Sequence, residues 1–91
     1  MSLSTTDALY EQAGSDPQSA LDQVLGLLPD ASGDDRIGLL HAMGLAHRNL
    51  RDPKLSADVL NQALEEAVGA GTNDDRQWAI RADLAVSLAD S

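Results

Sequence analysis

The chain has 91 residues, of which 15 are acidic and 6 are basic, so its formal net charge is −9 at pH 7. This acidity argues against nucleic-acid binding, because neutralising phosphate groups requires a large basic face. The length is that of one domain, and the absence of cysteine excludes disulfide scaffolds, thiol nucleophiles and thiolate zinc sites.

Hydropathy and the amino-terminal sequence indicate the location of the protein in the cell. No apolar run approaches the roughly 20 residues needed to span a bilayer, so we expect no membrane association. The first seven residues lack the basic start and the apolar stretch of a signal peptide. We therefore expect a cytoplasmic protein.

Five helices are predicted in chain order, and no segment shows the two-residue alternation of a strand. The second and fourth helices begin alike, at Asp16-Pro17 and Asp52-Pro53, where the aspartate caps the helix and proline takes the first helical position. The segment Gly69-Ala70-Gly71 is predicted to end the fourth helix in a left-handed cap. The predicted helices cover residues 5–13, 17–28, 34–50, 53–70 and 74–90.

The interior must be built from leucine and alanine, because the only aromatic residues are Tyr10 and Trp78. We also expect one face of the fifth helix to be buried in this interior. The residues assigned to that face are Trp78, Leu84, Ala85 and Leu88.

Two signals recur along the chain and indicate an internal repeat. The Asp-Pro pair at 16–17 returns at 52–53, after 36 residues. The tetrapeptide Gly33-Asp34-Asp35-Arg36 is matched by Asn73-Asp74-Asp75-Arg76, after 40 residues. Each signal marks a different helix start, and periods in this range are typical of stacked helical hairpins.

The central hairpin resembles the tetratricopeptide repeat, in which large, small and aromatic positions recur across a pair of helices. Gly44 and Ser56 stand at the small positions, where two helix backbones would approach closely. Arg51 stands where the family usually has a glycine in the inner turn. The positions that carry the resemblance are Leu40, Met43, Gly44, His47, Ser56, Leu60 and Ala63.

The resemblance implies an all-α, right-handed superhelix of antiparallel hairpins within one domain, residues 1–91. The hairpins would span about residues 5–28 and 34–70, and the last helix, 74–90, would be a lone first helix of a third repeat. The segment 43–48 is similar to first-helix motifs of actinobacterial members. Such arrays precede caspase-like CHAT domains or lie within multidomain bacterial regulators, which implies part of a larger protein. A five-helix bundle of unrelated topology is the alternative.

No constellation of residues predicts catalysis, a metal site or a cofactor. His41 and His47 point roughly 120° apart on a helix, so they cannot share one metal without another element. His47 occupies the aromatic core position of the repeat and is interpreted as a packed side chain. The Asp-Asp pairs lie at helix starts, where capping explains them. We expect a non-catalytic protein without metal or cofactor.

The resemblance implies that a peptide or partner domain binds in a concave groove lined by the first, third and fifth helices. His41, Leu45 and Arg48 share one face of the third helix, and Leu9, Leu45 and Val86 are expected to form an exposed apolar strip. The predicted groove residues are Leu9, Gln12, His41, Leu45, Arg48, Asn49, Ala82 and Val86.

Two other functions stay open at this point. A structural domain that self-associates would pair two copies through the last helix, with Ile80 in the contact. An acidic inhibitor or mimic would bind a basic protein, because residues 1–35 hold seven acidic and no basic side chains. Solubility alone also explains that acidity.

Overall fold

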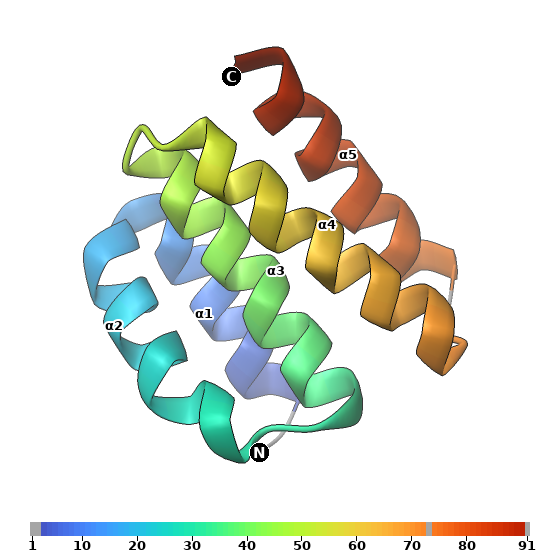
Figure 1. Cartoon of the computed structure of the whole chain (residues 1–91). Coiled ribbons are helices and arrows are strands. Elements are labelled where there is room, and N and C mark those ends of the chain that lie inside the picture. Colours follow the sequence, from blue (N-terminus) through green and yellow to red (C-terminus); the bar gives the residue numbers. More distant parts are fainter. Residues whose placement is uncertain (1–2, 73, 91) are drawn as a thin grey trace.

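The computed structural model describes residues 3–72 and 74–90, and these residues form an all-α fold without a strand. The five predicted α-helices are present and follow one another in chain order (Figure 1). None of the described helices has both the length and the apolar character needed to cross a membrane. The elements are α1 (Leu3–Ser15), α2 (Pro17–Leu27), the 3-10 turn η1 (Leu28–Asp30), α3 (Gly33–Asn49), α4 (Pro53–Ala70) and α5 (Asp74–Asp90).

Both Asp-Pro helix starts are confirmed. The side chain of Asp16 accepts a hydrogen bond from the Ser19 backbone N–H at 3.3 Å, and Asp52 accepts one from Leu55 at 3.2 Å. Each aspartate satisfies a helical N–H group that has no partner within its own helix, and the proline that follows has no N–H to satisfy. At the other end of α4, the left-handed cap expected in the segment 69–71 is confirmed, and Gly71 is the residue that adopts it, with φ of 69°.

The turn between α3 and α4 explains why a glycine would suit position 51. Arg51 has φ of 67°, a left-handed conformation that costs a residue with a side chain about 1–2 kcal/mol. The turn around it is closed by two backbone bonds, from Arg51 N–H to Arg48 O at 3.0 Å and from Asp52 N–H to His47 O at 2.9 Å. These bonds hold the arginine in a backbone geometry that glycine adopts without strain.

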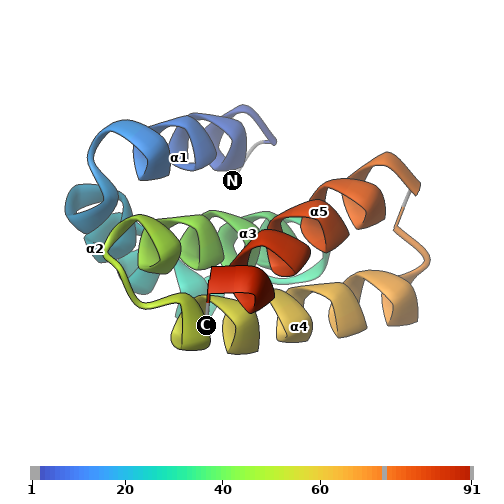
Figure 2. The ribbon, with the colours of Figure 1, turned by 90° about the horizontal axis from the view of Figure 1, so that it is seen from above.

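Helix α3 lies at the centre of the fold. Figure 2 shows α1 on one side of it and α4 on the other, with α5 lying along α4. The core forms three clusters around α3, and the half-buried Met43 packs against all three. A helix surrounded in this way must be apolar on most of its sides, which explains why α3 buries nearly every residue from Ile37 to His47.

Small residues allow α3 and α4 to approach closely, as the sequence predicts. Ser56 of α4 donates a hydrogen bond to the carbonyl oxygen of Gly44 at 2.6 Å, and its hydroxyl also lies 2.8 Å from that of Ser87 on α5. A Cβ atom at Gly44 would overlap the fully buried side chain of Leu60. The right-handed superhelix itself stays a prediction.

The predicted buried face of α5 is wrong. Trp78 is 67% exposed, Leu88 is 58% exposed and Ala85 is also exposed, whereas Leu84 is half-buried. The side chains that α5 does bury are Ile80 and Ser87. The physical reason is that α5 packs mainly against α4 through one side, and no described helix covers its opposite side.

The close approach at Gly44 leads to a prediction about stability. Gly44→Ala should lower the free energy of unfolding by about 1–2 kcal/mol, because the overlap with Leu60 outweighs the gain in helix propensity. Gly26→Ala is the matched control, since a Cβ there meets open space and should raise stability by about 0.5–1 kcal/mol. Urea unfolding followed by circular dichroism measures both, and equal stabilisation by the two changes would contradict the packing.

Candidate functional site

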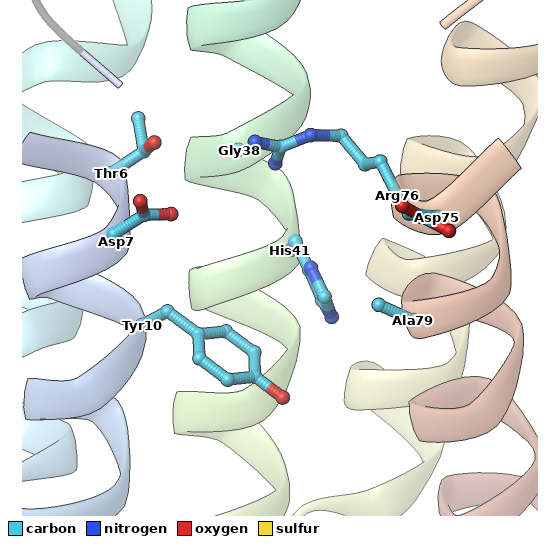
Figure 3. A pocket seen from close by; sticks show the side chains of 8 residues that line it. All are labelled: Thr6, Asp7, Tyr10, Gly38, His41, Asp75, Arg76 and Ala79. Carbon is cyan, nitrogen blue, oxygen red and sulfur yellow. The ribbon is translucent and has the colours of Figure 1, made fainter. Parts of the chain in front are cut away.

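A pocket of about 380 Å³ opens between α1, α3 and α5, the helices that the sequence assigns to a concave groove. Its lining residues come from all three helices, as Figure 3 shows, and those of α5 belong to the first two turns of that helix. The size is within the range of pockets that hold small ligands or single peptide side chains. The lining residues are Thr6, Asp7, Tyr10, Gly38, His41, Asp75, Arg76 and Ala79.

One carboxylate joins the three helices next to this pocket. Asp83 of α5 has one oxygen, Oδ2, 2.6 Å from His41 Nε2 of α3 and 2.7 Å from the Tyr10 hydroxyl of α1. Its other oxygen, Oδ1, lies 3.5 Å from a guanidinium nitrogen of Arg48. Because an ionised carboxylate only accepts hydrogen bonds, both Tyr10 and His41 donate to it. Asp83 therefore connects helices that are far apart in the sequence.

Asp83 is ionised in spite of its burial. Its side chain is only 15% exposed, and burial by itself raises the pKa of the carboxyl group. The hydrogen bonds from His41 and Tyr10 and the nearby positive charges outweigh burial, so the pKa lies below its ordinary value of 3.8. The charged form of Asp83 is thus the form that the network stabilises.

Tyr10 donates one of the hydrogen bonds that Asp83 accepts. Burial and the hydrogen bond to Asp83 raise the pKa of its phenol from 10.0 to about 12, because an ionised phenolate would lose its donor role and face a carboxylate. Its ring also lies against the ring of His41, with centroids 4.7 Å apart and planes inclined by 52°. Two aromatic rings therefore stand side by side in the floor of the pocket.

The structure brings together two of the predicted groove residues, His41 and Arg48, through their shared partner Asp83. The expected apolar strip is not formed, and this part of the prediction is wrong. Leu9 of α1 is only 4% exposed because it packs against α2 and α3. Leu45 of α3 is 7% exposed because α1 and α2 cover its side of the helix. Both residues belong to the core.

The four other predicted groove residues lie apart from the pocket. Gln12 faces α2, where its amide donates to the Ser19 hydroxyl at 3.0 Å. Asn49 donates to the carbonyl oxygen of Ala13 at 2.9 Å and so caps the end of α1. Ala82 and Val86 are exposed on α5, beyond the pocket-lining Ala79.

The sequence interpretation found one pocket-lining residue, His41, and missed the others, Tyr10 among them, as well as the adjacent Asp83. Aligning Ala85 of α5 with Gly44 of α3 places Asp83 opposite Ala42, which is fully buried against the preceding hairpin. A carboxylate at a position that is buried in the repeat is an unusual choice, because burying an unpaired charge is costly. That alignment was the available signal, and it points toward a paired, inward-facing Asp83.

His47 is a further buried polar residue, and it lies outside the pocket. His47 is buried as predicted, and its Nε2 has no hydrogen-bond partner among the described residues. Burial lowers the pKa of this imidazole although the charge of Asp52 opposes the shift, so the ring is neutral at pH 7. Within the described part of the chain, no three histidine, aspartate or glutamate side chains gather as metal ligands.

The Tyr10–Asp83 bond predicts how the protein responds to alkaline pH. Tyr10 is the only tyrosine, so ultraviolet absorbance reports its ionisation directly. We expect the folded protein to titrate near pH 12, and the stability that neutral Tyr10 contributes to be complete below pH 10 and lost as the pH rises to about 12. Asp83→Asn should move the midpoint part of the way toward 10. A wild-type midpoint of 10 with the fold intact would contradict the network.

Comparisons with known proteins do not assign the chain to a family. No protein-family model, curated protein or solved structure matches the chain. The tetratricopeptide resemblance therefore stays a prediction that rests on the residues of the central hairpin.

Proposed function

We propose that the chain is a non-catalytic protein-interaction module that binds a peptide or a partner domain in the pocket between α1, α3 and α5. The observation that carries the proposal is an open pocket of about 380 Å³ whose walls come from three helices joined by Asp83. The proposal includes a place within a larger, cytoplasmic protein, as the sequence suggests.

The polar atoms near the pocket support binding over catalysis. The Tyr10 hydroxyl and His41 Nε2 both donate to Asp83, so these two groups serve to join helices. What they offer to a ligand is the surface of their rings, beside the small side chains of Thr6 and Ala79. Such a lining provides contact area on a fixed framework, and a preformed site loses little conformational entropy on binding.

The exposed edge of α5 extends this binding surface beyond the pocket. Ala79, Ala82 and Val86 follow one another at spacings of three and four residues, so they lie on one side of the helix. Val86 is 47% exposed, and Ala79 and Ala82 are also exposed. The proposal therefore has a peptide lying along α5, with one side chain in the pocket and others over Ala82 and Val86.

Self-association through α5 is a second candidate, and the exposure of Trp78 is the observation that favours it. Trp78, Ala85 and Leu88 form an exposed apolar face on which two copies could pair. Ile80 was the expected contact residue, but it is fully buried and cannot take part. The net charge of −9 on each copy opposes their approach, so this candidate ranks second.

The proposed function is tested by closing the pocket. Peptides selected from a random displayed library on the wild-type protein should bind Ala79→Trp at least about tenfold more weakly, because the indole would fill the space beside His41. Ala89→Trp is the matched control, since it adds the same side chain at an exposed alanine of the same helix, away from the pocket. Its affinity for the same peptides should match that of the wild type, measured by calorimetry.

Two results would contradict the proposal. Equal losses in the two variants would show that the added indole acts without regard to the pocket, and full binding by Ala79→Trp would place the peptide elsewhere. Light scattering on the same samples decides the second candidate. A protein that is monomeric at all concentrations would argue against self-association. A dimer that Trp78→Glu converts to a monomer would favour it.

A further inference from the structure

Two carboxylates stand on opposite walls of the pocket. Asp7 comes from α1 and Asp75 comes from α5, and both are exposed. Neither carboxylate group makes a hydrogen bond or an ion pair with a residue in the ranges 3–72 and 74–90. Figure 3 shows the Asp7 carboxylate directed into the space that faces α3. Each of these two walls therefore carries one exposed carboxylate residue.

Acidic side chains outnumber basic ones around the pocket. Asp34 and Asp35 begin α3, and Asp74 begins α5, so further carboxylates lie at the helix ends nearest the pocket. Arg36, a basic residue of the same end, is bound to Glu66 of α4 at 2.7 Å. Among the described residues, Arg76 is the one arginine or lysine that lines the pocket, and the whole chain carries a net charge of −9. This field attracts a positive group.

The floor of the pocket also suits a cation. The rings of Tyr10 and His41 lie there, and the phenol of Tyr10 is neutral at physiological pH, as an unperturbed tyrosine also is. A cation over a neutral aromatic ring is attracted to the negative face of that ring. The methylene groups of a long basic side chain would pack on Ala79 and Tyr10, as such stems do on apolar surfaces.

From these features we propose that the pocket accepts the arginine or lysine side chain of a basic partner peptide, with Asp7 and Asp75 on either side of the charged group. This inference rests on the proposed function and adds the chemistry of its ligand. Arg76 reaches across the pocket toward Gly38 in Figure 3, so an incoming cation competes with it for the same acidic surroundings. Arg76 thus opposes the ligand.

The test uses two probe peptides that differ only in charge. One is acetyl-Gly-Gly-Arg-Gly-Gly-amide, and the other carries citrulline, the neutral isostere of arginine, in place of the arginine. Each is titrated at constant ionic strength into the ¹⁵N-labelled chain, and the amide signals of Gly38, His41 and Ala79 are followed by NMR. We expect the arginine peptide to shift these signals with at least about fivefold higher affinity than the citrulline peptide.

Charge variants give effects of opposite sign, which a merely structural change would not produce. Asp7→Asn and Asp75→Asn should each weaken the arginine peptide about two- to fivefold, whereas Arg76→Gln should strengthen it by a similar factor. Asp58→Asn is the matched control, because Asp58 is an exposed carboxylate on α4 outside the pocket, and it should leave the affinity unchanged.

Several outcomes would overturn the inference. They are equal binding of the two peptides, no binding of either, or losses in Asp58→Asn equal to those in Asp7→Asn. Equal binding would leave the proposed function standing, because library peptides of any charge still test it through Ala79→Trp. Conversely, charge-selective binding of the arginine peptide would stand even if the library peptides bound elsewhere.

Discussion

The Asp83 carboxylate is the interaction on which the site depends. Helix α5 packs mainly against α4, and its inner edge reaches α1 and α3 through the hydrogen bonds that Tyr10 and His41 donate to this one group. A buried carboxylate without partners would cost several kcal/mol, and two short bonds with an arginine nearby offset that cost. The same bonds fix how far α5 stands from α1, and therefore the width of the pocket between them.

This arrangement separates the groups that build the pocket from those that face it. Tyr10, His41 and Asp83 satisfy one another's polar atoms, so they hold the helices and present ring surfaces. Asp7 and Asp75 have no such partner in the described residues and remain exposed to a ligand. The proposed recognition of a basic side chain rests on this fixed frame with exposed acidic groups at its rim.

Local signals predicted the helices well, because each depends on neighbours in the sequence. The starts at Asp16 and Asp52 and the stop at Gly71 need only a capping oxygen or a left-handed glycine. Burial could not be predicted in the same way, since it depends on which helix covers a face. In α5, Trp78 and Leu88 align with Ile37 and His47 of α3, which α4 covers; the same apolar pattern is exposed on α5 because no described helix lies over it.

The distance between α1 and α5 tests the role of Asp83 most directly. The chain has no cysteine, so spin labels can be attached to cysteines introduced at the exposed positions Ala8 and Ala82, and electron double resonance then measures their separation. With Asp83 present we predict one narrow distribution of distances. With Asp83→Asn in the same labelled chain we predict a broader distribution that extends to longer distances, because α5 is released from α1. Identical distributions in the two proteins would contradict the account.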